Sequence, residues 1–287
     1  MIFHYIVRKN KKLNYNKMKK IYFIILICLI VIGVVIIIAT RRKESFKKPN
    51  VLIIGTQKGG TTNLKYLLGK HPDIFMYPHE IHYFNKNKLT EREYLKLFKT
   101  NKKIVGEKTP NYNINKKAMK KIYKFNPKVK LILLLRNPIT RAYSAWNHFK
   151  QHCPYDERSF RECIIDDLHN KKTRCQNKSI TMTTNGLIRY GRYIEHINDI
   201  LSLFPKDQLY IGITERFKKN TKYELDKILK FLGANCDHKL NLESHVHSRS
   251  YDQKMSQEDY DFLYKLYKPY NDRLFKHLGY RIPEWEN

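Results

Sequence analysis

Acidic residues are scarce in this chain of 287 residues: 26 Asp and Glu stand against 56 Lys and Arg, which gives a formal net charge of +30. A balance this positive attracts polyanions, namely nucleic acid, anionic membrane surfaces or acidic polysaccharides. Lys, Asn, Ile and Tyr are all abundant, so part of the charge can reflect the composition of the genome. The shortage of acids therefore indicates a class of partner without selecting one.

Cysteine is also rare, and its five copies form no C-x-x-C pair and no spacing typical of a zinc site. Cys28 falls in an apolar segment, which leaves Cys153, Cys163, Cys175 and Cys236 for the rest of the chain. Both disulfides and free thiols fit this pattern. A chain of this length buries an adequate core without disulfides, and it shows no internal repeat. Neither a cysteine-stapled fold nor a solenoid is expected.

Charge is missing altogether from residues 21–39, which are nearly all Ile, Leu, Val or Phe. At ~1.5 Å per residue, a helix of this length just crosses a ~30 Å hydrocarbon layer, which predicts a transmembrane helix. A cleaved signal peptide is the alternative, but its apolar core usually has only ~7–15 residues and ends in a small-x-small site. Residues 1–20 are basic and contain no acid, which favours a cytoplasmic N-terminus and a type II membrane protein.

The predicted organisation is a basic cytoplasmic tail at residues 1–20, a transmembrane helix at 21–39, a short stem at 40–50 and a folded domain at 51–287. A luminal, Golgi-like location is expected for that domain in a eukaryotic cell or host. In such a lumen, Asn177-Lys178-Ser179 is a sequon for glycosylation, which predicts a glycoprotein.

Apolar runs of strand length alternate with amphipathic stretches in this domain, which predicts an α/β fold: a phosphate-loop-like parallel sheet flanked by helices. The strands are expected near residues 51–55, 103–106, 129–135 and 208–213. The helices are expected near residues 61–69, 91–99, 115–125, 138–150, 157–168, 187–203, 221–232 and 256–277.

The first strand leads into a glycine loop, with the sequence VLIIGTQKGGTT from Val51 to Thr62. Glycines let several backbone N–H groups point at one anion, the N-terminus of the following helix adds a positive field, and Lys58 supplies a full charge. Gly55 and Gly60 have the spacing of a nucleotide-triphosphate loop, but Thr61 follows where that pattern requires lysine. The loop suits a phosphate-like group, although a tight turn that binds nothing also fits.

A candidate base follows in the segment Tyr77-Pro78-His79-Glu80-Ile81-His82-Tyr83-Phe84. This segment comes after the first helix of the domain, so we expect it near the C-terminal edge of the sheet, where open α/β folds bind ligands. In an extended chain Glu80 and His82 lie on one face, and either can act as a general base. Taken alone, the segment favours a solvated glutamate and a structural histidine.

Two further segments place cations at the ends of strands. Lys108 lies in Gly106-Glu107-Lys108-Thr109-Pro110, where a strand runs into a loop stiffened by proline. Arg136 ends the next apolar strand, and Ser144 lies about two turns along the following helix. A lysine beside a bound anion neutralises charge, and an arginine with a hydroxyl suits a phosphate dianion. A surface charge is the ordinary alternative for Lys108 and for Arg141.

In their order along the chain, these four segments resemble the motifs of sulfotransferases that use 3′-phosphoadenosine 5′-phosphosulfate (PAPS), most closely those acting on heparan sulfate glucosamine. The loop G-T-Q-K-G-G-T-T is similar to the 5′-phosphosulfate loop, and H-E-I-H-Y-F is similar to the segment that carries a glutamate base. E-K-T-P-N-Y resembles the segment beside the sulfuryl group, and R-N-P-I-T-R-A-Y-S resembles the 3′-phosphate motif, which is the most specific match. The second half of the chain matches more weakly.

The resemblance implies a role for each matching residue. For the 5′-phosphosulfate it implies Lys58, Gly59, Gly60, Thr61 and Thr62, and for the 3′-phosphate it implies Arg136 and Ser144. For the chemistry it implies Glu80 as the base, Lys58 and Lys108 as stabilisers of negative charge, and His82 as the residue that orients Glu80 or contacts the acceptor. Arg249, in a basic loop before the last helix, either caps the 3′-phosphate or is an exposed loop arginine.

The implied activity is the transfer of a sulfuryl group from PAPS, as co-substrate and without a metal, to a hydroxyl or amine. An anionic, glycosaminoglycan-like polysaccharide is the expected acceptor, and nucleic acid is not an expected partner. Heparan-type 3-O-sulfotransferases usually carry a cysteine-bridged hairpin before the basic loop, where this chain offers only Cys236. The acceptor therefore stays open, and a protein tyrosine or a small alcohol also fits.

Two functions of other classes stay open. An NTP-dependent phosphotransferase of the phosphate-loop type predicts Mg²⁺-dependent ATP binding, and the position of Lys58 argues against it. An inactive, membrane-anchored protein that binds polyanions predicts no affinity for 3′,5′-adenosine bisphosphate (PAP). The presence of Glu80, Lys108 and Arg136 argues against that loss of activity.

Overall fold

The computed structural model describes residues 23–24, 26–32, 46–86, 88–171, 186–237, 240–242 and 254–286. The chain divides into two units, Met1–Ser45 and Phe46–Asn287. In the first unit, the described residues are helical and exposed. Among all described residues, no helix combines the length and the apolar character needed to cross a membrane. Much of the span expected at residues 21–39 lies outside them, so the transmembrane helix stays a prediction.

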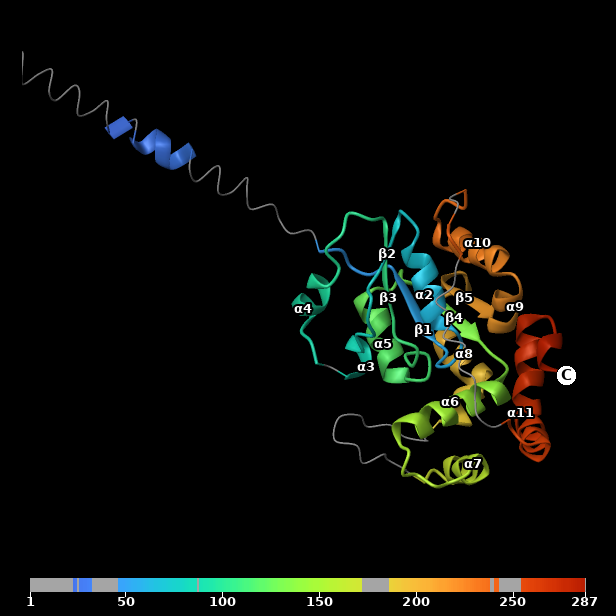
Figure 1. Cartoon of the computed structure of the whole chain (residues 1–287). Coiled ribbons are helices and arrows are strands. Elements are labelled where there is room, and N and C mark those ends of the chain that lie inside the picture. The colour runs from blue at the N-terminus through green and yellow to red at the C-terminus, as the bar shows by residue number, and fades with distance from the viewer. Residues whose placement is uncertain are drawn as a thin grey trace, which may run out of the picture. The chain divides into compact units, whose positions relative to one another are not determined.

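The second unit is built on one sheet of five parallel strands in the order β2-β3-β1-β4-β5 (Figure 1). The strands are β1 (Val51–Gly55), β2 (Ile74–Met76), β3 (Ile104–Lys108), β4 (Lys130–Leu135) and β5 (Leu209–Ile213). The central strand β1 places Val51 opposite Gly106 of β3 and Lys130 of β4. All five strands end at the same edge of the sheet, because they run in parallel.

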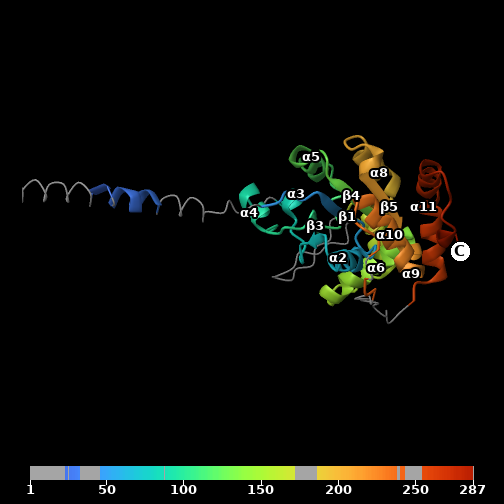
Figure 2. The same ribbon diagram turned by 90° about the horizontal axis from the view of Figure 1, so that it is seen from above.

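Both faces of the sheet are apolar, since the central strands are covered on both sides. Leu52 and Ile54 point to one face, where they pack with residues of α5 (Lys116–Phe125), α8 (Tyr193–Leu201) and α11 (Gln257–Leu278). On the other face, residues of α2 (Thr61–Gly69) and α10 (Thr221–Leu232) pack against the alternate side chains of the strands. Figure 2 shows α5 and α8 on one side of the sheet and α2 on the other.

A third apolar cluster lies beside the sheet and joins α6 (Pro138–His152), α7 (Phe160–Leu168) and α11. Helix α6 begins at an N-cap, Asn137, whose side chain accepts the N–H groups of Ile139 and Thr140. Cys153, the C-cap residue of α6, is disulfide-bonded, whereas Cys163 and Cys236 are free thiols.

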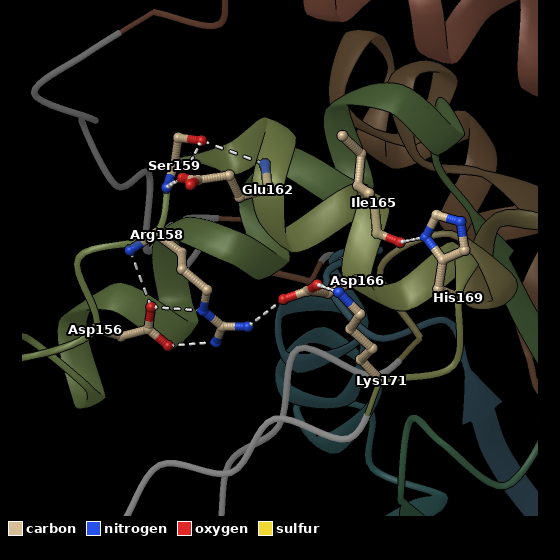
Figure 3. Close-up of polar contacts among 8 residues, drawn as sticks. All are labelled: Asp156, Arg158, Ser159, Glu162, Ile165, Asp166, His169 and Lys171. Atoms are coloured by element: carbon tan, nitrogen blue, oxygen red, sulfur yellow. Dashed lines mark hydrogen bonds and ion pairs between the residues drawn. The ribbon is translucent and has the colours of Figure 1, made fainter.

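Polar contacts fix the start of α7 (Figure 3). The Ser159 side chain accepts the backbone N–H of Glu162, and the Glu162 carboxylate accepts the N–H of Ser159 over 2.7 Å, which is a capping box. Just before the helix, Arg158 donates to the carboxylates of Asp156 and Asp166, the latter at 2.8 Å. The ion pairs hold the connection between α6 and α7 against the helix.

The parallel sheet and its covering helices confirm the predicted fold class, and the four expected strands lie within two residues of their observed bounds. Several short elements were not expected: β2, α3 (Tyr83–Lys86), α9 (Thr214–Lys219) and the 3-10 turns η2 (Lys206–Gln208) and η3 (Pro283–Trp285). The helix α4 (Glu91–Lys96) ends three residues earlier than expected. The helix expected at residues 187–203 is wrong at its start, where a 3-10 turn, η1 (Arg189–Gly191), precedes α8.

The reason for the late start of α8 lies in tertiary contacts. The carbonyl oxygens of Leu187 and Ile188 accept the hydroxyl of Tyr267, and the carbonyl of Leu187 also accepts the guanidinium of Arg141. These partners replace the bonds that would continue a helix. Such contacts join residues far apart in the chain, so apolar periodicity does not reveal them.

Candidate active site

The glycine loop leaves β1 at the C-terminal edge of the sheet and is fastened to β4 and to the start of α9. The N–H of Thr56 donates to the carbonyl of Leu134 over 3.0 Å, and the hydroxyl of Thr214 donates to the carbonyl of Gly59 over 2.8 Å. Lys58 and Gly60 have φ angles of 69° and 79°, in the left-handed region. A turn of this kind directs successive N–H groups toward one side, and α2 begins directly after it.

Gly59 is a position in this loop where the surrounding backbone leaves no space for a side chain. A Cβ atom there would lie 2.8 Å from the carbonyl oxygen of Leu134 and 3.0 Å from that of Thr56. Both are backbone atoms of the sheet and the loop, so neither can move aside cheaply. The glycine therefore lets the loop lie against the end of β4.

A cluster of charges lies beside this loop, at the end of β3 and in the segment after β2. The ammonium of Lys108 donates to the carboxylate of Glu80 over 2.5 Å and to the hydroxyl of Thr62 over 3.2 Å. Nε2 of His82 lies 3.3 Å from the same carboxylate. His82 and Lys108 thus both contact the Glu80 carboxylate. The segment is not extended as the alternation argument assumes, because His82 has a φ angle of 58°.

The charge cluster determines the ionisation of Glu80. Burial by itself raises the pKa of this carboxyl, but the hydrogen bonds from His82 and Lys108 and the Lys108 charge outweigh that effect and lower the pKa to about 2. Its side chain is still 38% exposed, so solvent moderates these interactions. At neutral pH Glu80 is an anion held between two donors.

A buried carboxylate beneath this cluster escaped the sequence analysis. Glu107 is fully buried and accepts hydroxyl groups from Tyr94 at 3.1 Å, Thr109 at 2.7 Å and Tyr112 at 2.9 Å. Burial raises the pKa of Glu107, and the hydroxyl groups offset only part of that rise. The hydroxyl oxygen of Thr109 also lies 3.4 Å from the N–H of His82, so Glu107 anchors the loops that present Lys108 and His82. The sequence did offer one signal of this site, because Glu107 is an acid directly after the strand expected at residues 103–106, and the buried strand β3 includes it.

Arg136, at the end of β4, reaches the glycine loop. Its Nη1 donates to the carbonyl of Lys58 over 3.1 Å, and its Nε donates to the hydroxyl of Thr140 over 3.1 Å. The hydroxyl of Tyr193 holds the carbonyl of Arg136 from behind at 2.7 Å. Ser144 lies buried farther along α6, and Arg249 lies outside the described residues.

Two more lysines belong to this edge of the sheet and were not singled out from the sequence. Lys65, on α2, donates to the carbonyl of Pro78, two residues before Glu80. Burial and the charge of Lys108 lower the pKa of Lys65. Burial and the nearby charge of Arg136 lower the pKa of Lys218, on α9. Both lie on helices, α2 and α9, and nothing in the sequence distinguishes them from the many other lysines.

Arg141 is not a surface charge. It is fully buried, and it donates to the carbonyls of Gly186 and Leu187. Its position on the inner side of α6, facing α11, explains why it is buried. It fixes the backbone before η1 and is separate from the exposed cluster around Glu80.

Taken together, these hydrogen bonds form one path along the sheet edge: Arg136 to the glycine loop, the loop through Thr62 at the start of α2 to Lys108, and Lys108 to Glu80. Cations at both ends of a left-handed turn can hold a ligand with two anionic groups, and a carboxylate lies beside one end. Within the described ranges, no three His, Cys, Asp or Glu side chains gather as metal ligands.

The fold and this edge define a phosphate-loop type of α/β protein. The chain belongs to the family of proteins with a sulfotransferase domain, whose model matches residues 48–266.

Curated relatives share the family and differ in length. The chain is 29% identical over 190 residues to human (Homo sapiens) heparan sulfate glucosamine 3-O-sulfotransferase 5, covering 64% of this chain and 53% of that protein. It is 26% identical over 282 residues to the human bifunctional heparan sulfate N-deacetylase/N-sulfotransferase 3, covering 86% of this chain and 32% of that protein. The chain thus spans about half the length of the first relative and about a third of the second.

A solved structure shares the fold. The sulfotransferase from Alicyclobacillus acidocaldarius superposes with a TM-score of 0.70 at 22% identity, over 84% of this chain and 100% of that one. At this identity the likeness concerns the fold alone.

Proposed function

We propose that the protein transfers a sulfuryl group from PAPS to a hydroxyl or amine of a glycosaminoglycan-like polysaccharide. One observation carries the proposal: the contact path that links Arg136, the glycine loop, Lys108 and Glu80 along one edge of the sheet. It supports a single pocket that grips both phosphate-bearing ends of an adenosine donor, with a carboxylate near the sulfur. Membership of the sulfotransferase family supports the same reaction.

In this proposal the donor lies along the glycine loop. The N–H groups of the loop, the start of α2 and the Lys58 ammonium receive the 5′-phosphosulfate; the residues assigned here are Lys58, Gly59, Gly60, Thr61 and Thr62. Arg136 and Ser144 receive the 3′-phosphate, and Arg249 closes over it. The guanidinium keeps donors to spare in this arrangement, because its fork offers five N–H groups.

The residues around Glu80 supply the chemistry. Glu80 takes the proton from the acceptor hydroxyl or amine, whose electron pair forms a bond to sulfur as the bond between sulfur and the bridging oxygen breaks. That oxygen keeps the bonding electrons and leaves on PAP. Lys58 and Lys108 stabilise the negative charge that gathers on the leaving phosphate, and His82 orients Glu80.

The ion pair between Glu80 and Lys108 sets the order of two steps, with donor binding before proton removal. A carboxylate with a pKa of about 2 is a weak base. When Lys108 turns its charge to the leaving phosphate, Glu80 loses a donor and becomes more basic. Proton removal is thereby coupled to donor engagement, which limits wasteful reaction of the donor with water.

An anionic polysaccharide is proposed as the acceptor on two grounds. The chain carries a net charge of +30, which attracts polyanions. Its relatives are named for heparan sulfate. We also propose a type II membrane anchor at residues 21–39 with the catalytic unit in the lumen. Glycosylation at Asn177 in cells, abolished by Asn177→Gln, is the measurement that checks this orientation.

The test is transfer from sulfur-labelled PAPS by the full chain to desulfated heparan, chondroitin and peptide acceptors, with an arm containing Mg²⁺ and ATP. We expect label in a polysaccharide, and we expect Glu80→Gln and Lys58→Ala to lose turnover. Glu80→Gln should keep its affinity for PAP, since Glu80 acts on the acceptor. Transfer of phosphate from ATP, or no affinity for PAP, would show that the assignment is wrong.

A further inference from the structure

The end of β5 lies next to both segments to which the donor is assigned. β5 pairs in parallel with β4, with Ile213 opposite Leu135, so Thr214 and Glu215 follow beside the turn that begins at Arg136. They are the first two residues of α9, and neither has been assigned to the donor or to the acceptor. From this position one short stretch contacts the glycine loop and the turn after β4 at the same time.

Thr214 holds the glycine loop. Its hydroxyl donates to the carbonyl of Gly59 over 2.8 Å, and both residues are buried. Its methyl group lies beside the next residue of the loop, because a Cβ atom on Gly60 would be 3.6 Å from Cγ2 of Thr214. A carbonyl oxygen does not bind an anion, so this bond takes no N–H group away from a ligand.

Glu215 holds the turn after β4, where the peptide group between Arg136 and Asn137 is bonded at both of its polar atoms. The Glu215 carboxylate accepts the N–H over 2.9 Å, and the hydroxyl of Tyr193 donates to the carbonyl over 2.7 Å. The plane of this peptide group cannot turn without losing one of the two bonds. Glu215 thus fixes the backbone from which the Arg136 side chain projects.

Glu215 is itself held by η3. Its second oxygen accepts the indole N–H of Trp285 over 3.1 Å, and Trp285 is only 2% exposed. The ring of Trp285 also packs against Tyr193, with 5.8 Å between the ring centroids. Trp285 therefore supports both side chains that hold the peptide group after Arg136. A carboxylate with a partner on each oxygen keeps one orientation, as a residue that positions others requires.

We infer that Thr214 and Glu215 are positioning residues that fix the separation between the two anion sites of the donor. The inference rests on the proposed function, in which the glycine loop receives the 5′-phosphosulfate and Arg136 receives the 3′-phosphate. Thr214 holds the first site and Glu215 holds the second, and the two residues are adjacent in the chain. A ligand with two linked anionic groups gains affinity when both sites keep the matching separation, because its second group then binds at a high effective concentration.

The test measures the affinity of the full chain for three nucleotides by titration calorimetry: PAP, adenosine 5′-monophosphate (5′-AMP) and adenosine 3′-monophosphate (3′-AMP). PAP occupies both anion sites, and each monophosphate occupies one. We expect Thr214→Val to weaken PAP binding by roughly tenfold and to change either monophosphate affinity by less than about twofold. Thr214→Ser keeps the hydroxyl and should bind PAP as the wild type does. If PAP and 5′-AMP lose affinity equally in Thr214→Val, the residue shapes one site only and the inference is wrong.

Two variants test Glu215, because Glu215→Gln changes a charge as well as a bond. The charge acts on PAP and on 3′-AMP alike, so the informative quantity is the ratio of their affinities. We expect Glu215→Gln to lower this ratio by roughly tenfold. Trp285→Phe keeps the charge and removes only the indole N–H, and it should lower the ratio by roughly threefold. A ratio that is unchanged in both variants would refute the role of Glu215.

The neighbouring helix α10 offers matched controls. Thr221→Val removes a hydroxyl that donates to the carbonyl of Phe217 over 2.9 Å, and Glu224→Gln alters a buried carboxylate paired with Lys227. These bonds stay within α9 and α10, so all three nucleotide affinities should be kept. Thermal unfolding shows that each variant is folded. If the controls lose as much PAP affinity as Thr214→Val, a general loss of stability explains the result and the inference fails.

The wild-type chain separates the two levels of the proposal. If it fails to bind PAP, the proposed function itself is wrong. If it binds PAP more tightly than either monophosphate, and if Thr214→Val and Glu215→Gln keep that advantage, only the inference about the two positioning residues fails.

Discussion

The guanidinium of Arg136 donates to the backbone carbonyl of Lys58 over 3.1 Å and so joins two segments that lie 78 residues apart in the chain. Together with the bond from the N–H of Thr56 to the carbonyl of Leu134, it holds the end of β4 against the glycine loop. The two segments were assigned to opposite ends of the same donor, and a pocket spanning both requires them to be neighbours. In the proposed function Arg136 supports the loop and also binds the 3′-phosphate, so a change at this residue affects both roles.

Arg136→Lys should therefore weaken PAP binding, even though it keeps the charge. A lysine cannot donate to the Lys58 carbonyl, the Thr140 hydroxyl and a phosphate with one planar fork. Loss of a charge-assisted hydrogen bond of roughly 1.5–3 kcal/mol corresponds to a fall in affinity of about ten- to a hundredfold. Titration calorimetry with PAP measures it. Arg92→Lys, at an exposed position on α4, is the control, and equal affinities in the two variants would refute the role.

Lys108→Met should raise the pKa of Glu80 above its value of about 2, because the carboxylate loses its ion pair and a hydrogen bond. This pKa lies below the ordinary 4.5, so the pairing stabilises the folded protein above that pH and is lost as the pH falls toward about 2. In Lys108→Met this acid-dependent loss becomes smaller.

Carbon-13 NMR of the Glu80 carboxyl measures the change directly. We expect no titration in the wild type between roughly pH 4 and 8, and a shifted midpoint in Lys108→Met. Lys103→Met removes an exposed lysine from the start of the same strand region and should leave the Glu80 midpoint in place. An unchanged midpoint in Lys108→Met would mean that His82 alone sets the ionisation of Glu80.

The strands and the loops of the donor edge were predictable because they depend on local pattern. Buried parallel strands are continuous apolar runs, and the runs that begin at Val51 and Leu131 have the length and composition of such strands. The glycine loop has steric requirements that the sequence displays. Parallel strands end at the same edge of a sheet, which was enough to expect Glu80, Lys108 and Arg136 at one edge, although β2 and the order of the strands were not predicted.

Contacts between distant segments were not predictable from the pattern. Arg141 sits in a helix whose periodicity does not say which polar residue faces inward, and its partners at Gly186 and Leu187 come from another part of the chain. Lys65 is likewise held by a hydrogen bond to the carbonyl of Pro78, which belongs to another segment. The bond between Glu215 and Trp285 joins residues 70 positions apart, which no single segment encodes.

Gly59→Ala should disrupt the donor loop. Its new Cβ would lie 2.8 Å from the Leu134 carbonyl oxygen, closer than van der Waals contact allows, so the loop must shift away from β4. We expect PAP affinity to fall at least tenfold, the cost of roughly 1.4 kcal/mol. Gly69→Ala is the matched control: the nearest atom to its Cβ is 3.9 Å away, and alanine in a helix should stabilise slightly. Similar PAP affinities for both variants would argue against a rigid loop.

Glu107 offers the sharpest test of how the fold supports the chemistry. Glu107→Ala leaves the hydroxyl groups of Tyr94, Thr109 and Tyr112 without their shared acceptor in a fully buried space. We expect the free energy of unfolding to fall by roughly 3 kcal/mol or more, measured with urea. Glu107→Gln keeps one oxygen as an acceptor, so its free energy of unfolding should fall by less.

The two variants also separate stability from positioning. Glu107→Gln should lower kcat while leaving PAP affinity nearly unchanged, because the loosened hydroxyl of Thr109 no longer fixes the loops of Lys108 and His82. Glu91→Gln, an exposed acid on α4, should change neither quantity. If Glu107→Gln keeps full kcat, the buried carboxylate serves the core alone. If kcat falls with stability intact, the anchor beneath the charge cluster belongs to the catalytic apparatus.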